Sequence, residues 1–304
     1  MVIILYMHHH LPDEIEGARE FLPSSEIVFL EFGIREGVEE FLEHFRNLST
    51  SGKPKIKFSK NEATPEVLKY LHPYSINYLK SIGELLKNSG KRIEIEESPI
   101  SADLFCSSEL LAIKGYEAFL DGDFIGAKDY LEEYLLSSAE IQKAREEKLV
   151  EKLSKLQEEN ENNNILALLG AFHTPIFWDL RKKGLEVKRH FSRRPYVFSY
   201  SDEISRRARF GKKIEEEELL RYFFDVGLRN YLGLLSKRFS ELDTLPQDAR
   251  ETISIFSRKV VEGKLEGLIE NILPELRKAE NLSDDVEKSL RIKERGGMGK
   301  WLGD

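Results

Sequence analysis

The sequence has little of what would place it in several large protein classes. Its 304 residues include a single cysteine, Cys106, which excludes an internal disulfide framework and a cysteine-based zinc site. Its apolar runs are far shorter than the roughly 20 residues that a membrane-spanning helix needs. The apolar start at residues 1–7, which no basic residue precedes, does not read as a secretory signal. We therefore expect a cytoplasmic protein without a transmembrane segment.

The charge balance is acidic. The chain has 54 Asp and Glu residues against 46 Lys and Arg, so its formal charge is −8, which disfavours nucleic acid as a partner coating the whole surface. Charged residues make up 33% and hydrophobic residues 40%, as in a folded domain rather than a disordered chain. The scarcity of glutamine beside many Glu, Lys and Arg residues points to a heat-adapted source.

Strand and helix patterns alternate from the first residue, which predicts an α/β fold. We expect a mostly parallel or mixed sheet with helices on both faces and a C-terminal all-helical segment. The spacing of the first two strands predicts a βαβ unit, and hence two parallel neighbours. The expected strands cover residues 2–6, 26–32, 55–59, 92–97, 165–169, 185–191 and 196–200.

The same patterns predict three parts of the chain. Residues 1–202 form an α/β domain with a helical insertion at about 60–160, in which a turn at 121–123 separates two helices. Residues 203–292 form a helical appendage or cap, with turns near 211, 243–246 and 274. Residues 293–304 are a glycine-rich tail that we expect to be mobile.

Polar residues that suit chemistry follow three of the expected strands. His8, His9 and His10 follow the first strand, Glu31 ends the second, and His173 follows the strand at 165–169. Because ligands bind beyond the carboxyl ends of parallel strands, we expect His10, Glu31 and His173 around one cleft. These residues, with His8, could hold a divalent metal ion of unknown identity and leave a position open for water. The alternative is a hydrogen-bonded network that closes the top of the sheet.

Two strand motifs and a helix carry a family resemblance. The apolar run at residues 3–7 leads into three histidines, and the later strand at 165–169 leads into Gly170-Ala-Phe-His173. Glu31 ends a strand between them, and a helix with Arg145 precedes the second motif. This order resembles the TraB/Tiki family and its erythromycin-esterase-like and ChaN-like relatives, over roughly residues 1–191.

The resemblance implies a hydrolase, either a metal-dependent peptidase or an esterase that uses histidine as a base. It implies a site built from His10, Glu31 and His173, with Glu31 and Arg145 in catalysis and a small-molecule or peptide substrate. Met7 stands where the family has glycine, and its side chain would crowd a ligand there. The alternative is therefore a non-catalytic regulatory or scaffolding protein that binds a ligand or partner in the same cleft. A homo-oligomer formed through the helical segment is a further expectation.

Arg145 has two interpretations that the sequence leaves open. A buried guanidinium could clamp a substrate carboxylate or hold Glu31 in a bidentate pair. An exposed one would belong to a surface helix laced with i,i+4 ion pairs, because Glu140, Glu146 and Glu147 surround it.

Basic residues are concentrated in one stretch. Residues 181–213 contain 12 Lys and Arg against 3 Asp and Glu, so this stretch carries +9 and the rest of the chain −17. Aromatic residues interleave with these bases, which predicts an anion-binding face at Arg189, Arg193 and Arg194. The alternative is that the bases complement a helix C-terminus and pair with the acidic residues at 215–218.

Overall fold

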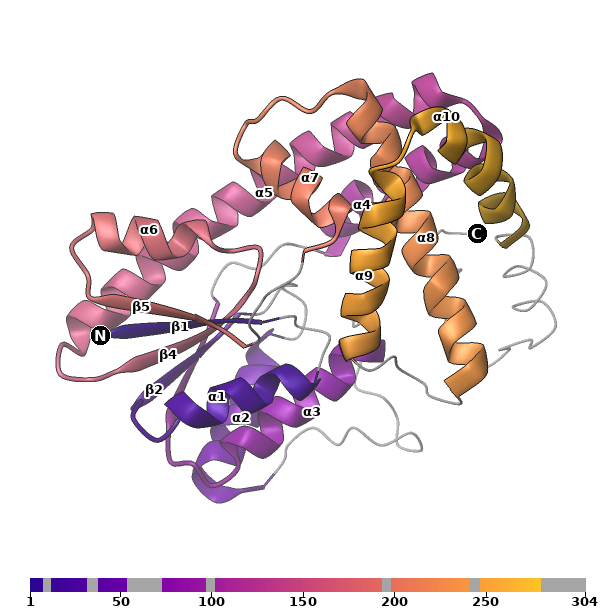
Figure 1. The fold of residues 1–304 in the computed structure, drawn as a ribbon. Coiled ribbons are helices and arrows are strands. Elements are labelled where there is room, and N and C mark those ends of the chain that lie inside the picture. The colour runs from indigo at the N-terminus through magenta and orange to yellow at the C-terminus, as the bar shows by residue number, and fades with distance from the viewer. Residues whose placement is uncertain are drawn as a thin grey trace. The chain divides into compact units, whose positions relative to one another are not determined.

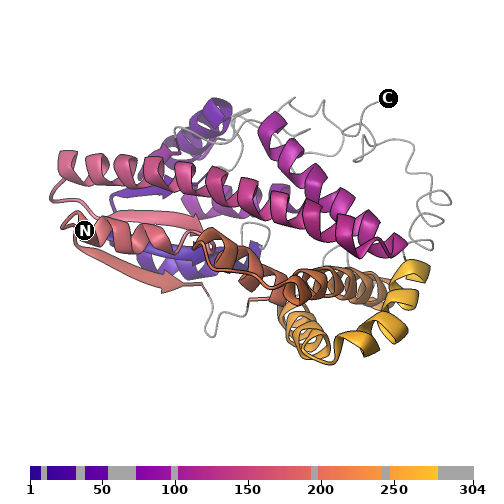
Figure 2. The same ribbon diagram turned by 90° about the horizontal axis from the view of Figure 1, so that it is seen from above.

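The computed structural model describes residues 1–7, 12–31, 38–53, 73–96, 102–192, 198–240 and 247–279. The chain forms two compact units. Unit 1 comprises Met1–Glu109 and Ser137–Tyr196, and unit 2 comprises Leu110–Leu136 and Val197–Asp304. The first two of the three passages between them lie inside helices α4 (Ala102–Asp121) and α5 (Phe124–Glu159), and Figure 2 shows α5 as one uninterrupted helix. The domain boundaries expected from the sequence stay a prediction, and the expected tail and the strand at 55–59 lie outside the described residues.

Unit 1 is built on a five-stranded sheet in which every pairing is parallel (Figure 1). The predicted α/β fold with a helical C-terminal segment is therefore confirmed. The strand order is β3-β2-β4-β1-β5. The strands are β1 (Val2–Met7), β2 (Ile27–Leu30), β3 (Arg92–Ile95), β4 (Ile165–Gly170) and β5 (Val187–Phe191).

The expectation that β1 and β2 are neighbours is wrong. Both strands are parallel, but β4 lies between them, with Ile165 opposite Val2 on one side and Ile27 on the other. β4 is apolar along its length and buried on both faces, so it takes the centre of the sheet. The crossover from β1 to β2 runs through the 3₁₀ helix η1 (Pro12–Ile15) and α1 (Glu16–Phe21). It passes over the position in the sheet that β4 occupies.

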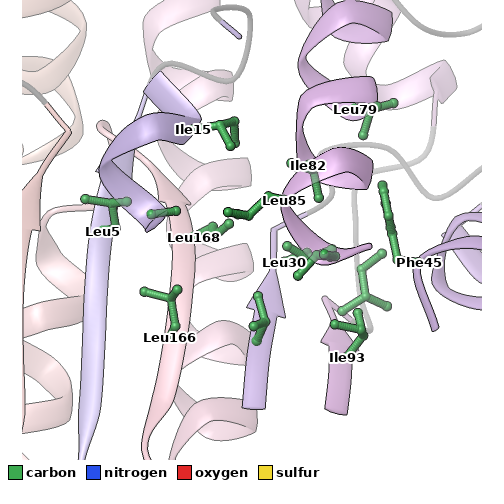
Figure 3. Packing of buried hydrophobic residues seen from close by; sticks show 14 of the residues in the cluster. Leu5, Ile15, Leu30, Phe45, Leu79, Ile82, Leu85, Ile93, Leu166 and Leu168 are labelled. Carbon is green, nitrogen blue, oxygen red and sulfur yellow. The ribbon is translucent and has the colours of Figure 1, made fainter. Parts of the chain in front are cut away.

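Helices cover both faces of the sheet. On one face, Leu5, Leu30, Ile93 and Leu168 pack against Ile15 of η1 and against residues of α2 (Val38–Ser51) and α3 (Pro73–Leu86), as Figure 3 shows. The alternate residues of β1, β2 and β4 are equally buried and face α6 (Pro175–Lys182) and the second half of α5 (Figure 1). This double coverage explains why β1 and β4 are unbroken apolar runs.

The regular secondary structure of unit 2 is helical in its described residues. It contains α7 (Tyr200–Arg209), α8 (Glu216–Ser240), α9 (Gln247–Val261), the short α10 (Leu265–Gly267) and the π-helical turn η3 (Leu268–Ile272). The first part of α5 and the end of α4 join this core, in which Phe119 stacks on Phe223 and meets Phe224 edge-on. Within the residues described, no helix combines the length and apolarity needed to cross a membrane.

Two expectations for unit 2 are wrong in detail. The strand expected at 196–200 is absent from its described part, because Tyr200 begins α7 and Ser199 caps this helix in a capping box with Asp202. The turn expected near Pro274 is replaced by helix that continues to residue 279. The π turn before it explains how: the backbone N–H of Leu273 bonds Leu268, five residues back, and this wider turn accommodates the proline that follows.

Candidate functional site

Five charged side chains meet at the carboxyl ends of β2, β3 and β4 in unit 1. Glu31 follows β2, Glu96 follows β3, and His173 follows β4 after a tight turn in which its N–H bonds the Gly170 carbonyl. Arg145 and Glu146 are consecutive residues of α5. All five side chains are between 2% and 7% exposed, so this cluster, the buried charge cluster, is almost closed to water.

His173 lies between two carboxylates. Its Nδ1 is 2.7 Å from Oε1 of Glu146, and its Nε2 is 2.9 Å from Oε1 of Glu31. Each ring nitrogen thus faces a carboxylate oxygen, and which nitrogen carries the hydrogen depends on the tautomer. The ring is therefore fixed in orientation with Nε2 turned toward Glu31.

Arg145 is the permanent cation of the cluster. Its guanidinium forms a bidentate pair with Glu96, with Nε 2.5 Å from Oε1 and Nη2 2.6 Å from Oε2. The same Nη2 donates to Oε1 of Glu31 at 2.6 Å. The surface-helix interpretation of Arg145 is therefore wrong, and the bidentate partner is Glu96 rather than Glu31.

The backbone completes the surroundings of Glu31. The N–H of Gly170, at the end of β4, donates to Oε2 of Glu31 at 2.6 Å. On the other side of His173, the hydroxyl of Tyr6 donates to the His173 carbonyl at 3.1 Å. Burial raises the pKa of Tyr6 above its usual range, so this hydroxyl keeps its proton and its bond. Neighbouring strand ends thus hold both Glu31 and the His173 turn in place.

The cluster has more potential negative charge than positive charge. Three carboxyl groups face one guanidinium and one imidazole, and burial raises the pKa of Glu96 even though Arg145 opposes the rise. Burial alone would lower the pKa of Arg145, but the charges of Glu31 and Glu96 outweigh it and raise that pKa. Arg145 therefore stays charged and compensates the two carboxyl groups beside it.

The structure brings together three of the residues expected at the site, Glu31, Arg145 and His173. His8 and His10 lie outside the described residues, so their expected roles stay predictions. The Met7 side chain is fully buried in the apolar cluster between the sheet and the helices α1–α3. The Met7 side chain thus fills space in the core on that face of the sheet.

Glu96 and Glu146 are site residues that the sequence analysis missed. Glu96 follows a strand whose alternating pattern assigns Glu94 and Glu96 to the polar face, although both are buried at the sheet edge. Glu146 lies in α5, where charged residues are so frequent that the sequence does not distinguish a buried one from the exposed ones. One signal was available for Glu146: it directly follows Arg145 in the helix that carries the family resemblance.

The expected anion-binding residues are only partly described. Arg189 lies on β5 with its side chain exposed, while Arg193 and Arg194 lie outside the described residues. Several other bases of this stretch pair locally: Lys182 with Asp179, Arg207 with Glu218 and Lys213 with Glu215. For these three bases the alternative of local pairing holds.

The donor atoms of the cluster suit a metal in part. His173 Nε2 and Glu31 Oε1 are of the types that bind zinc, and Glu146 bonds the other ring nitrogen, as carboxylates that orient histidine ligands do in metal sites. Across the described ranges, no group of three or more His, Cys, Asp or Glu side chains is arranged to hold a metal ion. The other two ligands that the sequence predicts, His8 and His10, lie outside the described residues.

The fold and the cluster define an α/β protein with a five-stranded parallel sheet and a buried His-Arg-Glu centre at its carboxyl edge. Comparisons of the chain with protein-family models, curated proteins and solved structures find no match.

Proposed function

We propose that this protein is a hydrolase of the kind that the TraB/Tiki resemblance implies, metal-dependent and acting on a small-molecule or peptide substrate. The observation that carries the proposal is the imidazole of His173, held between Glu146 and Glu31 at the carboxyl edge of a parallel sheet. Ligands of such sheets bind at this edge. A histidine with one nitrogen fixed by a carboxylate is the usual form of a catalytic base or a metal ligand.

In the proposed hydrolase, the residues of the buried charge cluster have different roles. In the proposed mechanism Glu146 accepts the hydrogen of Nδ1–H, which leaves Nε2 to accept a proton or bind a metal ion. Glu31 faces Nε2 and is the second acid–base group or ligand. Arg145, fixed by Glu96, lies beside Oε1 of Glu31 and stabilises negative charge there.

A divalent ion would be held by His173, Glu31 and a histidine of the pair His8 and His10. Zinc ligands stand about 3–4 Å from one another, so Nε2 and Oε1, now 2.9 Å apart, would separate slightly to admit an ion. Such an ion would supply a nucleophile by lowering the pKa of a bound water.

The non-catalytic alternative has an observation of its own in its favour. Every member of the buried charge cluster is paired with another member, and all are almost fully buried. Such closed polar networks also serve to define a unique packing arrangement. On this alternative, the same edge of the sheet binds a ligand or a partner but catalyses no reaction of it.

Metal content separates the two candidates. The protein is loaded with Zn²⁺ or Mn²⁺, dialysed and analysed for bound metal, and its hydrolysis of a panel of esters and peptides is measured with and without chelator. We expect about one ion per chain, hydrolysis that the chelator abolishes, and loss of both in His173→Ala. His190→Gln is the matched control because His190 stacks on Phe21, away from the cluster, and it should keep the metal. Equal metal content in His173→Ala would overturn the metal-dependent hydrolase.

A further inference from the structure

A second surface of unit 1 combines exposed aromatic and basic side chains. It is formed by α6 and β5, which are joined by a short turn at Gly184. Trp178 on α6 is 51% exposed, although indole rings are usually well buried. An exposed tryptophan of this kind marks a surface that can meet a ligand.

Arginines frame these aromatic rings. The guanidinium carbon of Arg189 lies 4.6 Å from the ring centroid of Phe177 and 5.2 Å from that of Trp178. Arg181 lies over Phe177 at 5.7 Å, and the rings of Phe177 and Trp178 meet edge-on at 4.9 Å. Cation–π contacts therefore hold the Arg189 guanidinium beside an exposed indole ring.

Most of the basic side chains here have no acidic partner among the residues that the structure describes. Residues 175–192 contain five Lys and Arg against two Asp and Glu, in a chain whose total charge is −8. Lys182 pairs with Asp179, but among the residues the structure describes Arg181, Lys183, Lys188 and Arg189 form no ion pair. Arg181, Lys183 and Arg189 leave a positive surface beside α6 that an anionic partner would neutralise. Lys188 points to the opposite face of the sheet, because side chains alternate along β5.

We propose that this α6–β5 surface binds single-stranded nucleic acid. Single strands are bound by aromatic side chains on which bases stack, next to cations that follow the phosphates. Trp178 provides a flat ring and Arg189 a planar guanidinium, and Arg181 and Lys183 provide further charges. An acidic peptide would use the cations but would leave the exposed indole without a role. The acidic total charge limits such binding to this one face, and the proposal is independent of the proposed hydrolase activity.

Tryptophan fluorescence tests the proposal directly, because the chain has only two tryptophans, Trp178 and Trp301. In a Trp301→Phe background, a 12-nucleotide oligothymidylate is titrated while the emission of Trp178 is followed at several salt concentrations. We expect the oligonucleotide to quench Trp178. Stacking on an aromatic side chain is worth about 1–3 kcal/mol per base, so Trp178→Ala, followed by anisotropy of a labelled oligonucleotide, should weaken binding about fivefold or more.

Two variants of Arg189 distinguish the contribution of its charge to binding from the contribution of stacking. Arg189→Ala should weaken binding and reduce the slope of log K against log salt by about 0.7, the value for one phosphate contact on a single strand. Arg189→Lys keeps the charge but loses the planar group, so it should keep the salt slope and bind more weakly than the wild type. Lys259→Ala, which removes an exposed charge from α9 in unit 2, is the matched control and should bind like the wild type.

Three outcomes would overturn the proposal. The first is absence of binding at low salt. The second is an oligonucleotide affinity that Trp178→Ala and Arg189→Ala leave unchanged, which would mean binding elsewhere on the chain. The third is equal or tighter binding of a polyglutamate peptide of the same charge, which would make this surface an acidic-peptide site.

Discussion

At the scale of single residues, the main feature of this protein is how much charge it buries in one place. An uncompensated buried carboxylate is costly, so each member of the cluster depends on the others. Arg145 is central because it contacts both Glu31 and Glu96, and its bidentate pair with Glu96 fixes its plane. The cluster should therefore be far more sensitive to loss of the cation than a surface ion pair is.

Replacing Arg145 tests this dependence. Arg145→Ala leaves Glu31 and Glu96 without their cation, and we expect the free energy of unfolding to fall by about 3–5 kcal/mol. Arg145→Lys keeps the charge but not the bidentate geometry, so its free energy of unfolding should lie between those of Arg145→Ala and the wild type. Arg19→Ala, which breaks an exposed pair with Glu16, should cost less than about 1 kcal/mol. The measurement is urea unfolding at pH 7, and similar losses in Arg145→Ala and Arg19→Ala would contradict the account.

His44 on α2 gives a prediction about pH. Burial lowers the pKa of His44 from 6.5 to about 4, and its ring meets Phe45 edge-on. The unfolded chain takes up the proton near pH 6.5 but the folded chain only near pH 4, so stability is lost as the pH falls through this window. The loss should approach about 3 kcal/mol at pH 4, at 1.36 kcal/mol per pKa unit.

His44→Leu removes this proton and isolates its effect. Urea unfolding between pH 7 and pH 4 should show a smaller loss of stability in His44→Leu than in the wild type, because one group fewer then takes up a proton on unfolding. The same pH dependence in both proteins would mean that the pKa of His44 is the same in the folded and the unfolded chain.

At the scale of elements, the sequence predicted what local patterns encode. The apolar runs of β1 and β4, the alternation in β3 and the turn between α4 and α5 are local signals, and each element lies at the predicted place within a few residues. The order of strands is a long-range property. β4 is hydrogen-bonded on both sides to strands more than a hundred residues away, so no local pattern could reveal that it separates β1 from β2.

The candidate site divides in the same way. Glu31 and His173 were predictable because each directly follows an apolar strand, and parallel strands bring such ends to one edge. Glu96 was not predictable, because β3 lies at the edge of the sheet. At an edge strand, the alternation of apolar and acidic residues is the same whether the acidic side chain is buried or exposed. Arg145 and Glu146 lie in a helix with charges all along it, and only tertiary packing decides which of those charges are buried.

The start of α7 gives a prediction about an element. The Ser199 hydroxyl accepts from the N–H of Asp202, and the Asp202 side chain accepts from the N–H of Ser199. Ser199→Ala removes half of this capping box and should lower the free energy of unfolding by about 1 kcal/mol. Ser205→Ala, inside the same helix, is the matched control and should have a much smaller effect. Equal effects of the two changes in thermal unfolding would show that the cap does not contribute.

At the scale of the whole molecule, the expected homo-oligomer stays a prediction with a defined surface. Ile255 and Phe256 are neighbours on α9 and are 42% and 51% exposed. If the helical segment mediates association, they belong to the interface. We expect the wild type to show a mass above that of one chain by light scattering, and Phe256→Glu to lower it to a monomer. An unchanged mass in Phe256→Glu would exclude this part of α9 from the interface.

The central claim is that the buried charge cluster works as one unit around His173, and a double-mutant cycle tests it most directly. Glu146→Gln, His173→Gln and the double variant are compared with the wild type by urea unfolding at pH 7. Because Oε1 of Glu146 and Nδ1 of His173 are 2.7 Å apart and buried, we expect a coupling free energy of about 1–3 kcal/mol. Additive effects of the two changes, with a coupling within about 0.5 kcal/mol of zero, would contradict the account.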